Sequence, residues 1–404
     1  MQEFDIVING GGMIGLSLAC GLQESGLRVA IIESHIPTLV QPNRPILRVS
    51  AINFASCRLL QYVQVWKEII AHGANAYHKI EVWEKDNFGK IMFDSLELSY
   101  PQLGYIVENS IIQQTLWCRA KQLNNIILFS PAELFQIVWR KTDVLLILKD
   151  GKMLTARLVV AADGAHSWIR QYVGIPLIFW DYQHHSLVAT VRTELPHRNI
   201  ARQAFCDDSI LAFLPLSNPH LSSIVWSLPP EIAQQYLIQS VEKFNMALAM
   251  CFSLTLGLCE LQGERKTFSL VGRYARHFAT HRLVLLGDAA HTIHPLGGQG
   301  INLGLMDVMV FLGELQRLKA LDKDIGCYSY LRHYECIRQH GNALMLMSMQ
   351  GLQELFSGHN PIKKWIRNQG LQIVNTLPGI KSCLIRQAMG LNDLPDWLAE
   401  KSFN

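Results

Sequence analysis

A glycine-rich turn near the N-terminus carries the residue types of a nucleotide-binding loop. From Asp5 to Gly15 the chain reads Asp-Ile-Val-Ile-Asn-Gly-Gly-Gly-Met-Ile-Gly, so a G-x-G-x-x-G pattern follows an apolar run and opens a helical one. In such loops Gly10 permits the tight turn, Gly12 lets the main chain approach a diphosphate, and Gly15 lets the helix pack against the strand. The helix N-terminus then offers unpaired N–H groups to the diphosphate. An ordinary glycine-rich turn is the competing interpretation.

An acidic residue ends the second strand of the same unit. The run Leu27–Glu33 is apolar until its last position, and Glu33 follows Gly10 by 23 residues. An acidic side chain at this place accepts hydrogen bonds from ribose hydroxyls and repels a 2′-phosphate. Strand, helix and terminal acid together predict FAD or NAD as the ligand, rather than NADP.

A second polar turn follows the apolar run Leu158–Ala162. It reads Asp-Gly-Ala-His-Ser-Trp-Ile-Arg from Asp163 to Arg170 and includes Gly164. This places Asp163 at the carboxyl end of a strand, where open α/β sheets bind ligands. Ser167 is suited to cap the helix that follows. The spacing fits a ligand site and a plain capped turn equally well.

A third turn follows the apolar run Leu283–Leu286 and spans Gly287–Gly304. Asp288 begins it at a strand end, where a carboxylate suits hydrogen bonding to a polyol chain. Pro295 fixes the main chain, and the helix that starts near Gly300 points its positive end at whatever the turn binds. A flat, anionic group such as a reduced flavin fits this arrangement. The turn's other candidate cofactor-binding residues are Gly297, Gly298 and Asn302.

The elements around these turns predict an α/β fold. Strands and helices alternate up to residue 175, and the run Arg48–Val63 is expected to be helical. Short β-rich runs then follow to Pro230, a strand recurs at Arg282–Leu286, and helical patterns fill the rest. This order predicts a nucleotide-binding domain interrupted by a second, antiparallel sheet domain. The expected bounds are 1–75, 106–175 and 271–325 for the nucleotide domain, 76–105 and 176–270 for the sheet domain, and 326–404 for a C-terminal helical region.

The composition excludes several classes of protein. The 404 residues hold 36 Lys and Arg against 33 Asp and Glu, a net charge of +3, which is too weak for a dedicated nucleic-acid binder. With 49% hydrophobic and 17% charged residues the chain is neither disordered nor fibrous. The charge-free stretch Ser209–Pro230 holds four prolines and predicts strands instead of a membrane span. The nine cysteines form no C-x-x-C pattern, and we expect reduced thiols in a cytoplasmic protein without a signal peptide.

The three turns, in this order and spacing, resemble those of the class A FAD-dependent aromatic hydroxylases of the p-hydroxybenzoate hydroxylase fold. The resemblance runs over nearly the whole chain. It implies a Rossmann-like FAD-binding domain interrupted by an antiparallel β-sheet substrate domain. Further segments resemble the ubiquinone-biosynthesis branch, and within it the 2-octaprenylphenol hydroxylases of the VisC type; they are Leu47–Asn53, Phe179–His185, Gly272–Arg276 and Ile385–Pro395.

The resemblance implies an FAD-dependent monooxygenase that hydroxylates the aromatic ring of a polyprenylated phenol. The expected substrate is 2-polyprenylphenol, oxidised at C5 through a flavin C4a-hydroperoxide, with O2 as co-substrate. The chain has a single G-x-G-x-x-G pattern, so NAD(P)H must visit transiently or a separate reductase must supply the electrons. Another flavoenzyme on the same scaffold, such as a prenyl reductase or a hydroxylase of a different aromatic, is the first alternative. A non-enzymatic FAD-binding component of a biosynthetic complex is the second.

The resemblance also assigns roles to single residues. The first glycine turn and Glu33 hold the ADP half of FAD, and Arg48 faces the FAD phosphates or the reductant. The second turn contacts FAD through Asp163, Gly164 and Arg170, and the third contacts the ribityl chain and the flavin ring from Gly287 onward. Many relatives carry arginine on the helix after the second crossover. Here that stretch offers Asn109 or Gln113 in its place.

Residues that could assist the chemistry lie near the expected substrate. Histidine and tyrosine suit acid–base work on a phenol, which makes Tyr182, His185 and His294 candidates, with Pro295 beside them. His184 and His291 are candidates by location only. A hydrogen-bonded structural role is the competing interpretation for each. No metal-ligand pattern is present.

The C-terminal region suggests a partner surface. A basic stretch contains Lys363, Lys364, Trp365 and Arg367 and fits a peripheral membrane contact, a complex subunit or a solvated face. The expected location is therefore the cytoplasm, with peripheral contact at the inner face of the membrane. A homo-oligomer is also compatible with the sequence.

Overall fold

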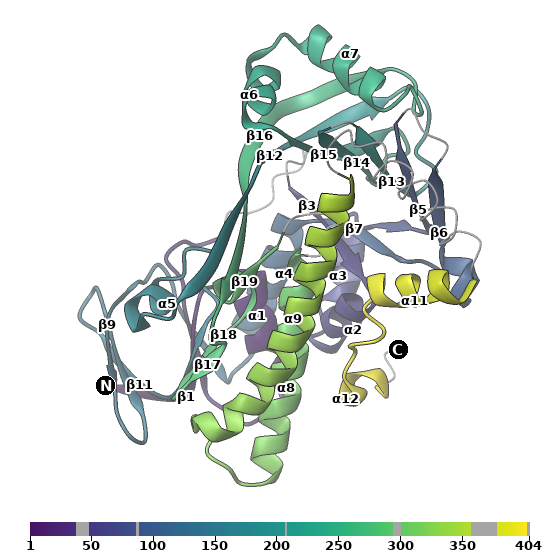
Figure 1. The fold of residues 1–404 in the computed structure, drawn as a ribbon. Helices are drawn as coiled ribbons and strands as arrows, with labels where there is room; N and C mark the ends of the chain where they lie inside the picture. The colour runs from purple at the N-terminus through teal and green to yellow at the C-terminus, as the bar shows by residue number, and fades with distance from the viewer. Residues whose placement is uncertain (38–47, 86–88, 207, 294–299, 357–377, 402–404) are drawn as a thin grey trace.

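The computed structural model describes residues 1–37, 48–85, 89–206, 208–293, 300–356 and 378–401. A parallel sheet forms the centre of its first domain (Figure 1). The strand order is β17-β18-β11-β1-β2-β8, and β18, β11, β1, β2 and β8 all run parallel. Their carboxyl ends therefore meet at one edge of the sheet. The bounds are β1 Gln2–Asn9, β2 Val29–Ile32, β8 Ile126–Phe129, β11 Met153–Ala161, β17 Ala279–Thr280 and β18 Leu283–Leu285.

The sequence of these strands explains why they are central. Ile6, Val7 and Ile8 of β1 are fully buried, as are Leu158 and Val159 of β11. Such continuous apolar runs are typical of parallel strands covered on both faces. The antiparallel pair β9 (Leu134–Trp139) and β10 (Val144–Leu148) extends from β11.

Helices from distant parts of the chain pack around this sheet. α1 (Met13–Gly21) contacts both α4 (Asn109–Gln122) and α8 (Gly300–Ala320). The short α5 (Trp168–Val173) follows β11 and is capped by Ser167. The remaining elements at this end are α2 (Phe54–Tyr62), α3 (Trp66–Ala71), and the small sheet of β3 (Val49–Asn53), β7 (Gly104–Glu108) and β4 (Asn75–Tyr77).

The prediction of a helix over Arg48–Val63 is wrong in its first half. Val49–Asn53 is strand β3, and the helix α2 begins only at Phe54. The Asn53 side chain accepts a hydrogen bond from the Ser56 N–H and so caps α2. Because asparagine is a favoured N-cap residue, the helix begins after Asn53, although the apolar pattern continues on both sides of this boundary.

A second, larger sheet forms the other domain, in the order β19-β16-β12-β15-β14-β13-β5-β6. Its neighbouring strands are antiparallel as expected, except that β13 and β5 run parallel. The reason is that β5 and β6 come from an earlier part of the chain and join the sheet at its far edge. The bounds are β5 Lys79–Glu84, β6 Lys90–Asp94, β12 Leu177–Thr193, β13 Ile200–Cys206, β14 Ser209–Pro215, β15 Leu221–Leu228, β16 Cys259–Ala275 and β19 His291–Thr292.

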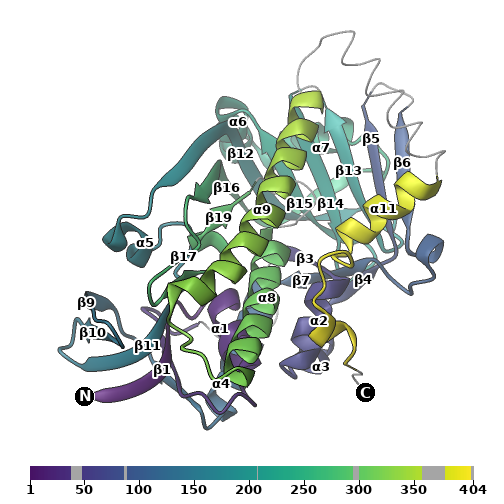
Figure 2. The ribbon, with the colours of Figure 1, turned by 60° about the horizontal axis from the view of Figure 1, so that its bottom comes forward.

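Two features connect the domains. The long strands β12 and β16 run from the large sheet down to the first domain (Figure 1). The 29-residue helix α9 (Tyr328–Phe356) lies beside α8 at one end and reaches the large sheet at the other (Figure 2). Helices α6 (Pro230–Ile238) and α7 (Val241–Cys251) cover the outer face of that sheet. The predicted domain bounds stay predictions, and β16 runs without a break across residue 270.

The C-terminal end of the chain returns to the first domain. α11 (Pro378–Ala388) is followed by α12 (Asp396–Ala399), whose Trp397 donates its indole N–H to the Met309 carbonyl at 3.2 Å. Along the described ranges, none of the helices combines the length and the apolar character needed to cross a bilayer.

Candidate cofactor and active site

Three polar turns meet at the carboxyl edge of the parallel sheet. Main-chain hydrogen bonds place them side by side: the Gly10 N–H donates to Ile32 O at 2.8 Å, and the Ala162 N–H donates to Asn9 O at 2.8 Å. The Leu286 N–H donates to Ala161 O at 3.0 Å. The turns predicted separately from the sequence, after β1, β11 and β18, are therefore neighbours in space.

The glycine turn has room for a ligand at one position and none at the other two. A Cβ on Gly10, which has φ +114°, would lie 2.3 Å from the Ala162 carbonyl oxygen, and a Cβ on Gly15 would lie 2.0 Å from the Gly10 oxygen. A Cβ on Gly12 would meet no atom of the described residues within 4 Å. Gly12 is also the N-cap of α1 and gives no side-chain hydrogen bond to the helix. This uncapped helix end, beside open space, fits the diphosphate of a dinucleotide.

Glu33 lies directly behind the glycine turn. Its carboxylate accepts hydrogen bonds from the Gly11 N–H at 2.6 Å and from the His35 N–H at 2.9 Å. The side chain is half-buried and lines a cavity of about 560 Å³. The acid is thus fixed by main-chain donors in the position where a ribose would lie.

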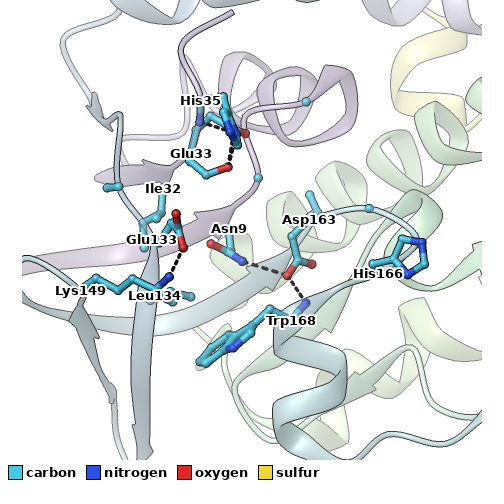
Figure 3. A pocket seen from close by; sticks show the side chains of 16 residues that line it. Asn9, Ile32, Glu33, His35, Glu133, Leu134, Lys149, Asp163, His166 and Trp168 are labelled. Carbon is cyan, nitrogen blue, oxygen red and sulfur yellow. Dashed lines mark hydrogen bonds and ion pairs between the residues drawn. The ribbon is translucent and has the colours of Figure 1, made fainter.

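That cavity opens along the carboxyl ends of β1, β2 and β11 and along the chain between β8 and β9. Figure 3 shows Glu33 and His35 on one side and Asn9, Asp163 and Trp168 on the other. Its volume is within the range of small-ligand pockets, and its lining combines several polar and charged side chains with apolar ones. The cavity fits the adenosine end of FAD.

Of the two carboxylate oxygens of Asp163, in the second turn, only one has hydrogen-bond partners among the described residues. One oxygen accepts hydrogen bonds from the Asn9 amide at 2.9 Å, from the Trp168 N–H at 2.9 Å and from the Ile169 N–H at 3.2 Å. The other oxygen is buried and has no hydrogen-bond partner among the described residues. Next to it, a Cβ on Gly164 would meet no atom within 4 Å. An unpaired buried oxygen beside open space suits a ligand hydroxyl.

Arg170 supports the second and third turns from behind. Its guanidinium is 2% exposed and donates to the Ala165 carbonyl at 2.9 Å and to the Ala289 carbonyl at 2.8 Å. Burial lowers the pKa of Arg170, and the nearby Asp163 opposes that shift. The contact with FAD predicted for Arg170 stays a prediction, because the described contacts are to main-chain carbonyls.

The third turn presents one carboxylate to solvent. Gly287 and Ala289 are buried, while Asp288 between them is exposed. The surrounding protein still raises the pKa of Asp288 through desolvation, against the positive charges of His291 and Arg48. Asp288 is thus an exposed carboxylate close to His291 and Arg48. Of the other residues predicted here, Gly300 begins α8 with open space around its Cα, and His294, Pro295, Gly297 and Gly298 lie outside the described residues.

Helix α4 offers neutral amides at the place where the resemblance to the class A hydroxylases leads us to expect arginine. The Gln113 side chain donates to the Gly11 carbonyl at 3.0 Å and so touches the glycine turn. Asn109 instead accepts a hydrogen bond from the Ser50 hydroxyl at 2.6 Å. Arg48 is exposed, with its guanidinium 4.6 Å from the centre of the Phe268 ring. Of the two alternatives on α4, Gln113 is the one next to the expected diphosphate.

Asn302 connects the first turn of α8 to β3 and α2. Its side-chain oxygen accepts from the Asn53 N–H at 3.1 Å and from the Ser56 hydroxyl at 2.8 Å. Its amide donates to the Ala51 carbonyl at 2.8 Å, and the residue is 3% exposed. The hydrogen bonds of Asn302 are therefore structural ones within the protein, and its direct contact with FAD stays a prediction.

The described acid–base candidates lie in two parts of the structure, on β12 of the large sheet and in the third turn. Tyr182 and His185 lie on β12 of the large sheet, Tyr182 buried and His185 half-buried. The His184 ring nitrogens lie 2.9 Å from the Tyr182 carbonyl and 3.0 Å from the Asp208 carbonyl. His291 is 2% exposed and lies 2.7 Å from Asp307. His184 and His291 are therefore held by structural partners, which leaves Tyr182 and His185 as the described candidates.

Sequence reasoning missed the partners of His291. They are Asp307 on α8 and, beyond it, Arg338 and Asn342 on α9. A signal existed, because an aspartate within an otherwise apolar helix must find a buried partner. Within the described part of the chain, no group of three or more His, Cys, Asp or Glu side chains could hold a metal ion.

Comparisons with known proteins agree with this geometry. A family model described as an FAD binding domain matches residues 3–318, and one described as squalene epoxidase matches residues 269–403. The 3-demethoxyubiquinol 3-hydroxylase of Escherichia coli is 34% identical over 96% of this chain and 99% of its own length. The ubiquinone hydroxylase UbiL of Rhodospirillum rubrum is 33% identical over 96% and 89%.

A solved structure supports the fold. The p-nitrophenol 4-monooxygenase PnpA of Pseudomonas putida superposes with a TM-score of 0.77, covering 98% of this chain and 99% of its own, at 17% identity. The FAD-binding model spans well over half of the chain, and the curated relatives align along nearly all of it. The chain therefore belongs to the family of FAD-dependent monooxygenases, in the branch of the ubiquinone-biosynthesis hydroxylases.

Proposed function

We propose that this enzyme hydroxylates the aromatic ring of a polyprenylated phenol in ubiquinone biosynthesis. The observation that carries the proposal is an apolar, incompletely buried face on the large sheet, next to the three cofactor turns. The names of the relatives supply the pathway. The proposed substrate is 2-polyprenylphenol, and the proposed position of attack is C5.

The two faces of β14 differ in what they pack against. Leu211 and Phe213 are buried in the cluster formed with α7 on the outer face. The alternate residues Ile210 and Leu214 point the other way and are only half-buried. Ile210 packs with Phe205 and with Met349 of α9. This inner side of the sheet therefore offers hydrocarbon surface toward the C-terminal helices.

Apolar side chains continue from there toward the flavin turn. Leu346 of α9 packs with Ile293, which lies in the third turn, and with Leu303 of α8. Trp180 of β12 and Met345 of α9 join the same cluster. A polyprenyl tail that lay against the half-buried Ile210 and Leu214 would bury apolar surface, at about 25 cal/mol per Å². A small soluble aromatic would not need them.

When bound and reduced, FAD supplies the activation of O2 for transfer of one oxygen atom to an electron-rich ring. The protein groups bind, orient and exclude water. Gly12, Glu33 and Asp163 would hold the ADP half, and Asp288 would hold the ribityl chain. The apolar walls exclude water from the reacting ring, which favours hydroxylation over wasteful peroxide release.

Tyr182 and His185 are the residues proposed to assist hydroxylation through the proton of the phenol. Both lie on β12, and a tyrosine or histidine can hold or remove the proton of the phenol oxygen and so make the ring more electron-rich. His294 and Pro295 are proposed as neighbours of the same ring from the third turn. The electron donor is proposed to be NAD(P)H or a separate reductase, with Arg48 exposed near Asp288 as a contact for it.

A second substrate has its own support. The Escherichia coli relative is named for 3-demethoxyubiquinol, and it is similar over almost its whole length. A polyprenylated ring of either kind lies in a bilayer, so we also propose peripheral membrane contact. Flotation of the full chain with liposomes tests it. Residues 363–367, the basic stretch that suggested this contact, lie outside the described residues.

The test is mass spectrometry of lipid extracts from a strain that lacks the gene. Accumulation of a polyprenylphenol supports the proposal, and accumulation of demethoxyubiquinone supports the second substrate. The wild-type gene should restore ubiquinone, and a Gly12→Ala gene should not. Normal ubiquinone without a new intermediate would overturn both.

A further inference from the structure

A buried cluster of charged side chains lies beneath the third turn. Asp307 of α8 is 0% exposed. One of its oxygens accepts from the Gly287 N–H at 2.9 Å and lies 2.7 Å from His291 Nε2. The other accepts from Arg338 Nε at 2.6 Å and from the Asn342 amide at 3.4 Å. All four donors thus converge on a single carboxylate.

The carboxylate is ionised in the folded protein. Burial alone would raise the pKa of Asp307, but His291 and Arg338 outweigh it and hold the pKa well below its usual value. Arg338 is itself 3% exposed and also donates to the Asn342 side-chain oxygen at 2.9 Å. A buried charge with this many partners has a fixed position, because any displacement leaves a charged group unpaired.

Asp307 holds the turn on both sides of Asp288. It binds the main chain of Gly287, the residue immediately before Asp288, and the ring of His291, three residues after it. Gly287 has φ +59°, and a Cβ there would lie 3.0 Å from a side-chain carbon of Ile14 on α1. The turn is therefore clamped between α1 and α8, and the exposed Asp288 is the part that projects from it.

The clamp is anchored from the C-terminal helix α9. Tyr334 donates its hydroxyl to the Leu285 carbonyl of β18 at 3.1 Å, one turn of helix before Arg338. Glu335 accepts the Phe278 N–H at 2.8 Å. Figure 2 shows α9 crossing beside α8 on its way to the large sheet. One face of α9 thus holds the strand, the turn that follows it and the helix after the turn.

We infer that Asp307 and Arg338 are positioning residues for FAD, and that α9 sets the affinity for the cofactor through them. Asp307 transmits the position of α9 to the main chain at Gly287, and this decides where Asp288 presents its carboxylate. The inference rests on the family's use of FAD and not on the proposed substrate. A cluster that serves stability alone would change folding and leave FAD affinity as it is.

Arg338→Gln tests this, with Arg202→Gln as the matched control. Arg202 is 9% exposed and pairs with the buried Glu81 at 2.8 Å, but it lies in the large sheet away from the turns. The readouts are the dissociation constant of FAD, from flavin fluorescence during titration of the apoprotein, and the melting temperature of the apoprotein. Residues that orient the direct ligands of a metal typically contribute about 10- to 100-fold to its affinity, and we expect an effect at the lower end of that range for FAD.

The expected result is about a tenfold weaker FAD affinity for Arg338→Gln and an unchanged FAD affinity for Arg202→Gln. Both variants should have a lower melting temperature than the wild type. Arg338→Lys keeps the charge and should recover part of the affinity. If Arg338→Gln does not fold, Asn342→Ala and Arg338→Lys are compared with the control in the same way. Equal FAD affinity in the α9 variants and the control would overturn the inference. Hydroxylation is not a readout, so an error in the proposed substrate would leave this result unaffected.

Discussion

The side-chain amide of Asn9 donates a hydrogen bond of 2.9 Å to the carboxylate of Asp163, which lies 154 residues further along the chain. Asn9 ends β1 and Asp163 follows β11, so this bond joins the glycine turn to the second turn. The same Asp163 oxygen accepts the Trp168 N–H at the start of α5. One carboxylate therefore orders two of the three turns that form the cofactor site.

Asp163→Ala should destabilise the protein and weaken FAD binding together. The variant loses the bond to Asn9 and the two main-chain bonds at the start of α5. Hydrogen bonds to a charged group contribute about 1.5–3 kcal/mol, so the free energy of unfolding should fall by about 2 kcal/mol or more. Denaturant unfolding of the apoprotein measures this. Asp150→Ala, in an exposed hairpin turn beside Lys152, is the control and should stay within about 0.5 kcal/mol of wild type.

Gly12→Ala and Gly15→Ala should fail for different reasons. The described residues place no atom within 4 Å of a Cβ at Gly12, so its alanine variant should fold normally and lose FAD, because the methyl group occupies the diphosphate's place. The Gly15 variant places a methyl group against the Gly10 carbonyl and should lose about 1–3 kcal/mol of stability. Thermal melts with and without FAD separate the two effects. Gly351→Ala, at an exposed position inside α9, should leave FAD affinity unchanged and raise stability by up to about 1 kcal/mol. FAD binding by the Gly12 variant at wild-type affinity would contradict the placement of the diphosphate.

Asp288→Asn should stabilise the apoprotein at neutral pH. Because the folded protein raises the pKa of this carboxyl, the folded state binds a proton more tightly than the unfolded chain does. Stability is therefore lost as pH rises from the ordinary aspartate pKa of about 4 through the folded value. The asparagine variant lacks this loss, so its advantage in melting temperature should be larger near about pH 7 than near about pH 4. A pH-independent difference would contradict the raised pKa. FAD affinity should fall, because the carboxylate for the ribityl chain is gone.

Gln113→Ala should weaken FAD binding modestly. The Gln113 amide holds the Gly11 carbonyl, and one hydrogen bond of about 1 kcal/mol corresponds to roughly a fivefold change in the dissociation constant. Gln113→Arg introduces the residue type that the resemblance to the class A hydroxylases implies for this helix, and it should bind FAD at least as well as wild type. Gln122→Ala, exposed at the far end of α4, is the control for helix propensity. If Gln113→Ala binds FAD with unchanged affinity, a different residue of α4 must make the proposed contact with the cofactor site.

The cofactor turns could be predicted from the sequence because their signals are local. Glycines with a fixed spacing, a strand before them and an acid after the next strand are read within about 30 residues. The start of α2 was misplaced because the cap at Asn53 lies inside an apolar run that continues through both elements. The parallel pairing of β13 with β5 could not be predicted, since it joins segments about 120 residues apart. The cluster at Asp307 was missed for the same reason, because its partners come from the third turn and from α9.

The most direct test of the proposed function follows the fate of oxygen. FAD-loaded enzyme is supplied with a reductant, O2 labelled with oxygen-18 and 2-polyprenylphenol in detergent, and the extracted lipid is analysed by mass spectrometry. The account predicts one labelled hydroxyl group on the ring, at C5, and consumption of reductant coupled to that product. If the ring of 2-polyprenylphenol stays unlabelled while the labelled oxygen is recovered as hydrogen peroxide, the proposed hydroxylation is contradicted.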